Sequence, residues 1–532
     1  MATAIDRGHA SGAHDMKLVV SASAVGTIFE WYDFFIYGTL AASGIIGRAF
    51  FPAGNETVQT LLAWAGFAVG FGFRPLGAVL FGYLGDKLGR KYTFLVTITV
   101  MGLATAGVGL VPAESAIGLA APAIVLLLRI AQGLALGGEY GGAAIYVAEH
   151  APPRRAGYYT SFVQAGVAGG FILSLAVVLA VKAGCSAAVW DAWAWRLPFV
   201  FSLALLGVSL WMRLKLSESP VFEAIRSAGE TARNPFVESL RYPGNWKRLF
   251  VAMVGIAAGL TVIWYTATFS VLSFTQQAMR LDSTVAQLLT GVGVLAGLFW
   301  FVLFGRLSDR IGRKKPIVIG YAATLVLLFP LFWAIGNAAN PALATAARRA
   351  PVVVSGPDCR YSPFAKQQAD RCGQMLDYFS KKGIAYTTVR APATVVTVGG
   401  VTVDDPTPQR LDATLAANGY DLGTVVPSAR GIVELLLAIV ALAALSGATY
   451  GPVAALLAEM FPPRIRYSSM SIPYHIGCGY FGGFLPFISQ YVVARTGNPY
   501  AGLWYTWIVV AIALVVTAWG LKETAPLENA RR

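Results

Sequence analysis

Residues 82–91 read Gly-Tyr-Leu-Gly-Asp-Lys-Leu-Gly-Arg-Lys, and residues 305–314 read Gly-Arg-Leu-Ser-Asp-Arg-Ile-Gly-Arg-Lys. The two stretches lie 223 residues apart and share the Gly, Asp, Gly-Arg-Lys skeleton at identical spacing. Each follows a helix-length apolar segment and begins a basic link. A motif repeated in the same context predicts a chain made of two related halves.

A second pair of similar stretches shows that the two halves differ in length. Residues 148–154 (Ala-Glu-His-Ala-Pro-Pro-Arg) are echoed by residues 458–464 (Ala-Glu-Met-Phe-Pro-Pro-Arg), at an offset of 310 residues. The second offset exceeds the first by 87 residues, so the second half contains an insertion of about that length. The polar stretch 339–429 matches it in size.

The composition indicates a membrane protein. Of the 532 residues, 56% are hydrophobic and only 13% are charged, about half the charged share of a soluble domain. This excludes a disordered protein and an ordinary soluble enzyme, and four cysteines are too few for a disulfide scaffold. The net charge of +14 lies mostly in short links between apolar runs, so we expect the lipid bilayer as a partner and no nucleic acid.

The apolar segments predict an all-α polytopic fold of twelve transmembrane helices. Each is long enough for the roughly 20 residues that a span needs. No small-residue cleavage site precedes the first, so we interpret it as a retained span. The expected limits are 18–44, 58–84, 92–112, 119–148, 157–182, 194–215, 249–276, 284–306, 315–338, 430–459, 467–494 and 502–521.

Lys and Arg in the links predict the orientation. They concentrate in the links 2–3, 4–5, 8–9 and 10–11, which therefore face the cytoplasm together with both termini. We expect a multi-pass protein of the bacterial inner (plasma) membrane. The expected parts are a cytoplasmic tail (1–17), an N-terminal six-helix bundle (18–215), a central cytoplasmic loop (216–248), a C-terminal six-helix bundle (249–338 plus 430–521), an extracytoplasmic insert (339–429) and a second tail (522–532).

The insert has the pattern of a small α+β domain. Residues 351–354, 385–389 and 394–398 are typical of short strands, and residues 367–382 of one helix. Cys359 and Cys372 lie in it, outside the membrane by the topology above, where disulfides persist. We therefore expect a Cys359–Cys372 bridge, the alternative being two free thiols. No His accompanies them, so no metal site is predicted.

Further motifs carry a family resemblance. They are Glu-Trp-Tyr-Asp-Phe at 30–34, Arg-Pro-Leu-Gly at 74–77, Arg-x-x-Gln-Gly at 129–133 and Gly-Gly-Glu-Tyr-Gly-Gly at 137–142. With the duplicated loop motif, the chain resembles transporters of the major facilitator superfamily. Within it, the chain is similar to the metabolite:proton symporter branch, relatives of shikimate, α-ketoglutarate and proline/betaine carriers. The resemblance implies uptake of a small organic anion or zwitterion by alternating access, driven by the proton gradient and without a cofactor.

Charged residues inside the spans are the candidate site, because such residues are costly in a membrane. Glu30 and Asp33 lie midway along the first helix and share a face. Arg74 and Arg129 fall near the same depth. We expect Asp33, or else Glu30, to take up a proton and thereby free an arginine for an anionic substrate. The alternative is a fixed internal ion pair.

The fourth predicted helix extends this site. Helical spacing places Arg129, Gln132, Glu139 and Tyr140 on one stripe, and Tyr265 in the seventh helix could line the opposite half. Packing is an equally good explanation for Tyr265. Glycines at four-residue spacing, Gly133 and Gly137, predict a close approach to a neighbouring helix.

The resemblance also implies a cytoplasmic gate. Its aspartates, Asp86 and Asp309, begin the two basic loops and can accept from a neighbouring helix N-terminus. The expected ion pairs are Glu149 with Arg90 and Glu459 with Arg313. The alternative is that these positive charges only set the topology.

Three classes of function are compatible with the sequence. The leading hypothesis is a proton-coupled importer that acts as a monomer on a small-molecule substrate. The alternatives are an efflux antiporter and a membrane sensor that uses the insert. An enzyme is not expected, since Gly291-x-Gly293 lies within a span and not on a strand–helix turn.

Overall fold

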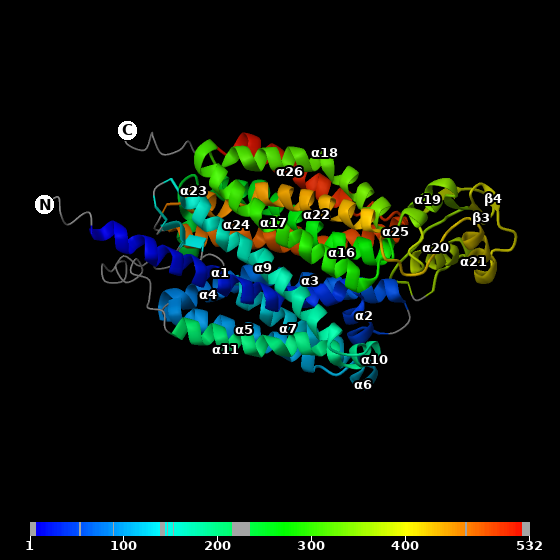
Figure 1. Ribbon diagram of the computed structural model, residues 1–532, viewed down its shortest axis with the longest axis horizontal. Helices are drawn as coiled ribbons and strands as arrows, with labels where there is room; N and C mark the ends of the chain where they lie inside the picture. Colours follow the sequence, from blue (N-terminus) through cyan, green and yellow to red (C-terminus); the bar gives the residue numbers. More distant parts are fainter. Residues whose placement is uncertain are drawn as a thin grey trace.

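Two groups of long helices lie side by side, and a small domain projects from one end of them (Figure 1). The computed structural model describes residues 7–52, 55–88, 90–138, 144–145, 147–149, 151–152, 154–214, 235–365, 367–462 and 465–523. The helix α1 begins, and α26 ends, at the end of the bundle opposite the projecting domain (Figure 1). We call that end the terminal face and the other end the insert face.

The first half of the chain forms one helical group. Its elements are α1 (Arg7–Ala42), α2 (Ile45–Phe50), α3 (Glu56–Gly72), α4 (Arg74–Leu88), α5 (Arg90–Leu110), α6 (Glu114–Ile117), α7 (Ala120–Gly137), α9 (Ala156–Ala183), α10 (Ala187–Ala192), η1 (Ala194–Arg196) and α11 (Leu197–Leu214). Helix α1 packs on α9, and α7 packs on α3, α4 and α5.

The second half forms the other group. Its elements are α13 (Pro235–Arg241), α14 (Asn245–Phe250), η2 (Val251–Ala258), α15 (Gly259–Tyr265), η3 (Thr266–Ser270), α16 (Val271–Ser273), η4 (Phe274–Ala278), α17 (Ser283–Ile311), α18 (Lys314–Ala339), α22 (Ala429–Tyr450), α23 (Val453–Met460), α24 (Arg466–Ile476), η6 (Gly477–Gly483), α25 (Leu485–Thr496) and α26 (Leu503–Gly520). Helix α17 packs on α9 of the first group, which joins the halves.

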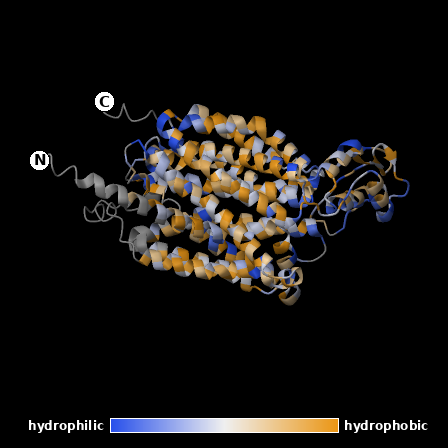
Figure 2. Cartoon of the chain, in the orientation of Figure 1, coloured by the Kyte–Doolittle hydropathy of each residue, from blue (hydrophilic) through white to orange (hydrophobic). Residues whose placement is uncertain are grey.

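Ten helices among the described residues are long and apolar enough to cross a membrane. Figure 2 shows their hydrophobic residues along the length of the bundle, with hydrophilic residues gathered at its ends and over the projecting domain. The two other predicted segments, 18–44 and 92–112, are covered by α1 and α5, and α5 contains the shorter apolar stretch Leu95–Leu110. The ten are Glu56–Phe81, Ala120–Gly137, Ala156–Ala183, Ala194–Met212, Asn245–Ala278, Ser283–Ile311, Lys314–Ala339, Ala429–Met460, Ser468–Thr496 and Leu503–Gly520.

Several predicted helices differ in detail from the observed ones. The first begins at Arg7 instead of residue 18. The segment predicted at 58–84 consists of α3 and α4, and the second begins just before Pro75, a residue that suits the first turn of a helix. The segment predicted at 430–459 is interrupted at Gly451-Pro452, because proline supplies no backbone donor for a continuous helix.

The projecting domain is an α+β unit and is called the insert. It contains α19 (Pro341–Arg349), β1 (Val352–Gly356), α20 (Arg371–Lys381), β2 (Tyr386–Arg390), β3 (Val395–Val398), β4 (Val401–Thr402) and α21 (Pro408–Ala417). The sheet has the order β2-β1-β3-β4, with β1 parallel to β2 and the other pairs antiparallel. The sequence predicts β1, β2, β3 and α20 to within a few residues, but not β4, α19 or α21.

The insert has its own hydrophobic core. Val352 and Val354 of β1, Phe379 of α20 and Val396 of β3 are all at most 1% exposed. The valines alternate with more exposed residues along β1 and β3, as in a sheet that buries one face, and Phe379 packs on that face from α20. Cys359 and Cys372 form a disulfide that ties the loop after β1 to α20.

Candidate functional site

Two glycines bring α7 against α3 and α4. A Cβ atom on Gly133 would lie 1.9 Å from the carbonyl oxygen of Gly70, and one on Gly137 would lie 2.1 Å from that of Arg74. No side chain fits at either position, so the helix backbones touch there. This is the predicted close approach, and it places Arg74 and Arg129 in one region of the first helical group.

Arg129 is fully buried among neutral partners. Its Nη1 donates to Oε1 of Gln132 at 2.7 Å, and its Nε donates to the carbonyl oxygen of Gly66 at 3.4 Å. Its guanidinium carbon lies 4.2 Å from the ring centre of Phe34 and 4.5 Å from that of Tyr37. Such cation–π contacts contribute about 0.5–2 kcal/mol each, and they hold the guanidinium in place without cancelling its charge.

Hydrogen bonds connect Arg129 through Gln132 to Thr105, which lies beside the backbone of Asp33. Gln132 Nε2 donates to Oγ1 of Thr105 at 2.7 Å. The Thr105 hydroxyl donates to the carbonyl oxygen of Met101 at 2.8 Å and lies 3.4 Å from that of Asp33. Asp33 itself is 6% exposed, and its Oδ1 has no hydrogen-bond partner in the protein. Thr105 was not predicted as a site residue, because one threonine in an apolar helix carries no signal of its contacts.

Arg74 is the least satisfied polar side chain of the site. It is fully buried, and its three guanidinium nitrogens make no hydrogen bond within the protein. Its guanidinium carbon lies 5.1 Å from the ring centres of both Trp31 and Phe71. Across the interface of the two helical groups, its charge lies within Coulombic reach of Tyr265 and His475. A buried guanidinium without an anion costs several kcal/mol, so this position is suited to accept one.

Tyr265 carries the site into the second helical group. It is 1% exposed and lies 5.4 Å, centre to centre and edge-on, from the ring of Phe71. Its ring stacks on Phe269 at 5.8 Å. Arg129 also lies within Coulombic reach of the Tyr265 hydroxyl. Tyr265 therefore faces both arginines across the interface.

The structure brings together most of the predicted site residues, but without ion pairs between them. Asp33, Arg74, Arg129, Gln132 and Tyr265 are all buried in the interior, and none faces outward. In the part of the chain that the structure describes, neither arginine lies within ion-pair distance of a carboxylate. Glu30, three residues before Asp33 on α1, is partly exposed. Glu139 and Tyr140 lie outside the described residues.

At the terminal face, Asp309 joins the two helical groups. Its Oδ1 and Oδ2 accept from the backbone N–H groups of Gly157 and Tyr158, each at 2.8 Å. These donors lie in the first turn of α9, where N–H groups have no partner within the helix and the helix dipole favours an anion. That Asp309 accepts from a helix N-terminus is the contact expected from the sequence.

Arg313 and Arg466 form ion pairs at the same face. Arg313 is 6% exposed and pairs with Asp309 Oδ1 at 2.7 Å and with Glu459 Oε1 at 2.9 Å. The expected contact of Glu459 with Arg313 is thus present. Glu149, which we expected beside Arg90, forms an ion pair at 2.7 Å with Arg466 of the second helical group. The side chains of Asp86 and Arg90 lie outside the described part of the structure.

Comparisons with known proteins agree with this architecture. The sequence profile described as Major Facilitator Superfamily matches residues 23–355. The shikimate transporter of Escherichia coli is 37% identical over 319 residues, 59% of this chain and 71% of that protein. The proline/betaine transporter of the same organism is 32% identical, over 60% of this chain and 64% of its own length. The resemblance to shikimate and proline/betaine carriers is therefore confirmed.

Solved structures agree on the fold. The xylose transporter of E. coli, in a partially occluded inward-open conformation, superposes with a TM-score of 0.60 at 16% identity, covering 96% of this chain and 98% of its own. A D-xylose-proton symporter gives a TM-score of 0.57 at 16% identity, covering 96% and 98%. The relatives are transporters and not enzymes, and the expectation of a non-enzymatic membrane protein is confirmed. The duplicated loop motif, the paired helical groups and the match over residues 23–355 show that this chain belongs to the major facilitator superfamily of multi-pass membrane transporters.

Proposed function

We propose that this protein takes up a small organic anion or zwitterion together with protons by alternating access. In this scheme twelve helices span the bacterial inner membrane, the terminal face is cytoplasmic, and the insert lies outside. The names of the relatives, which are shikimate and proline/betaine transporters, support a carboxylate-bearing substrate.

The observation that carries the proposal is the buried guanidinium of Arg74. Its three nitrogens have no hydrogen-bond partner in the protein, although the side chain is fully buried. A carboxylate can accept two parallel N–H bonds from a guanidinium, and these charge-assisted bonds are about twice as strong as neutral ones. Arg129 is held by Gln132 and two aromatic rings, so Arg74 is the better donor to a substrate.

Asp33 is the proposed proton carrier. It is buried, and its Oδ1 lacks a hydrogen-bond partner. Thr105, which accepts from Gln132, lies beside the backbone carbonyl of Asp33, so Asp33 and Arg129 share one region of the interior. A change of charge at Asp33 acts on Arg129 through the electrostatic potential of that region. A carboxylate at this depth is expensive to keep charged, which favours proton uptake before the loaded site turns inward.

The contacts of Asp309 and Arg313 are the proposed gate on the cytoplasmic side. The two bonds from α9 to Asp309 hold the helical groups together at the terminal face, while Arg313 pairs with Asp309 and Glu459 within the second group. In this scheme the substrate site is closed from that side. Opening to the cytoplasm requires the two bonds between α9 and Asp309 to break. The substrate is then released when the groups separate there.

The test uses purified protein in proteoliposomes and substrate-driven proton entry. Arg74→Gln is expected to abolish uptake of a carboxylate probe, whereas Arg410→Gln, which removes an exposed cation of the insert, should leave it unchanged. Asp33→Asn should abolish accumulation against a gradient and spare substrate exchange. Uptake that is indifferent to the proton gradient would overturn the coupling, and full uptake by Arg74→Gln would overturn the site.

A further inference from the structure

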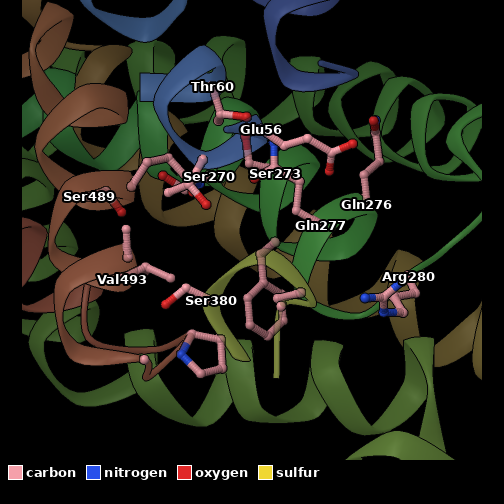
Figure 3. Close-up of a pocket in the computed structure, with 18 of the residues that line it drawn as sticks. Glu56, Thr60, Ser270, Ser273, Gln276, Gln277, Arg280, Ser380, Ser489 and Val493 are labelled. Carbon is pink, nitrogen blue, oxygen red and sulfur yellow. The ribbon is translucent and has the colours of Figure 1, made fainter. Parts of the chain in front are cut away.

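A cavity lies at the insert face, away from the residues of the central site. Its volume is about 330 Å³, and none of Asp33, Arg74, Arg129 and Tyr265 lines it. Figure 3 shows side chains from both helical groups and the insert around it. They include Glu56 and Thr60 of α3, Ser273 of α16, Ser380 of the insert and Ser489 of α25.

The insert is fastened over this cavity mainly by the second helical group. Arg280 donates from Nη1 to the carbonyl oxygen of Leu422 at 2.9 Å and from Nη2 to that of Lys382. Backbone bonds of 2.9 and 3.0 Å join Val425 to the segment after η4, at Arg280 and Asp282. The insert is therefore a fixed part of the cavity wall, since these bonds hold its loops to the outer end of a spanning helix.

One contact also reaches the first helical group. Asn55, the residue that caps α3, has its Nδ2 3.4 Å from Oδ1 of Asp377 in α20. The cavity thus lies between both helical groups and the insert. In alternating access these are the parts whose distances change.

Several polar groups of the cavity have no partner within the protein. Ser273 is 1% exposed and its Oγ makes no hydrogen bond. The Nε2 of Gln276 and the Nε of Arg280 are buried and equally unpartnered. A buried donor that is left without an acceptor destabilises the protein, so a ligand that supplies an acceptor is favoured here. Three donors that line one cavity form a site for a ligand with acceptor atoms, and a carboxylate offers two.

The charges of the cavity are mixed. Arg280 supplies a guanidinium at one edge, and Glu56 of α3 supplies an exposed carboxylate (Figure 3). The two groups lie within Coulombic reach of each other. Lys381 also lines the cavity, but its ammonium pairs with Asp377 at 2.6 Å. A simple anion would be repelled by Glu56 and a simple cation by Arg280. A molecule with both charges meets each of them favourably.

We propose that this cavity is an outer binding site for a small zwitterion, which the insert roofs and which the substrate occupies before it reaches Arg74. The proposal rests on the proposed transport function and adds a substrate class and a role for the insert. Its carboxylate accepts from Ser273, Gln276 and Arg280, and its cationic end lies toward Glu56. A volume of about 330 Å³ holds a small ligand of amino-acid or betaine size, at the lower end of ligand pockets.

The experiment compares two probes of different charge on the full chain in proteoliposomes. The probes are glycine betaine, a zwitterion, and shikimate, an anion. Glu56→Gln is expected to raise the KM for glycine betaine about tenfold with little change in maximal rate, and to leave or lower the KM for shikimate. The matched control is Glu114→Gln, which removes an acid from the first turn of α6 at the same face but outside the cavity.

A binding measurement separates this proposal from the transport function. Calorimetric titration of glycine betaine into the purified unaltered chain should give binding that Glu56→Gln and Ser273→Val each weaken at least fivefold. Equal affinities for Glu56→Gln and Glu114→Gln, or no binding of glycine betaine, would overturn the outer site even if transport is intact. If neither probe is transported, the transport proposal fails, while binding that depends on Glu56 still supports the outer site.

Discussion

Replacing Asp309 by Ala tests the closed terminal face most directly. Asp309 accepts two bonds from the first turn of α9, at 2.8 Å each, and these are bonds between the two helical groups. Its bond with Arg313 lies within one group and persists when the groups separate. Of the bonds of Asp309, the two to α9 therefore contribute to the difference between the closed and open states. The ion pair of Glu149 with Arg466, which also joins the groups, is unchanged by the substitution.

The size of the effect follows from those two bonds. A hydrogen bond to a charged group contributes about 1.5–3 kcal/mol, so at the lower end the pair stabilises the closed face by about 3 kcal/mol. Since about 1.4 kcal/mol corresponds to a factor of ten, Asp309→Ala should raise the fraction of molecules open at this face about 100-fold. Glu434→Gln is the matched control, because Glu434 pairs with Arg430 on the same helix, α22, and bridges nothing.

Thiol labelling measures the open fraction. Ser161 of α9 is fully buried against Gly305 of α17, so a thiol there reacts only when the terminal face opens. When opening is fast relative to labelling, the reaction rate follows the open population. Ser161→Cys should react about 100-fold faster with a maleimide in the Asp309→Ala background. Equal rates in the Asp309→Ala and Glu434→Gln backgrounds would refute this account of closure.

Three further predictions concern stability. Gly137→Val places a side chain where a Cβ already lies 2.1 Å from the carbonyl oxygen of Arg74, so it should lower the thermal midpoint by several degrees or prevent folding, whereas Gly207→Ala, with open space around it, should not. Cys359→Ser should lower the stability of the insert by about 2–4 kcal/mol, seen as faster proteolysis between residues 351 and 428 with the helical bundle intact; unchanged proteolysis would contradict it. Lys382 and Tyr378 donate to Asp412 and hold the pKa of its carboxyl below its ordinary value of about 3.9. The charged carboxylate therefore stabilises the folded insert fully above about pH 4, and this stabilisation is lost as the pH falls through the lower pKa of the folded state. The protease resistance of the insert should fall in that acid range, and Asp412→Asn should have a flatter pH dependence; identical profiles would exclude Asp412 as the cause.

The membrane character, the duplication and the insert are predictable from the order of residues alone. These features are local or periodic: an apolar run of 20 residues has a helical length, and a loop motif repeated at 223 residues requires no knowledge of contacts. The insert strands near 352, 386 and 395 were predictable because residues alternate there with the period of a half-buried strand. The same holds for Gly133 and Gly137, whose spacing on one helix face indicates a close neighbour.

The tertiary structure alone decided which side chains meet. Glu149 pairs with Arg466, 317 positions away, and Gln132 binds Thr105 of another helix, although helix periodicity predicts only the face on which each lies. The same limit applies to Arg74, whose lack of a partner depends on every helix around it. The outer cavity arises only where α3, α25 and the insert come together. Spacing along one helix fixes direction, but the distance between two helices depends on how all their neighbours pack.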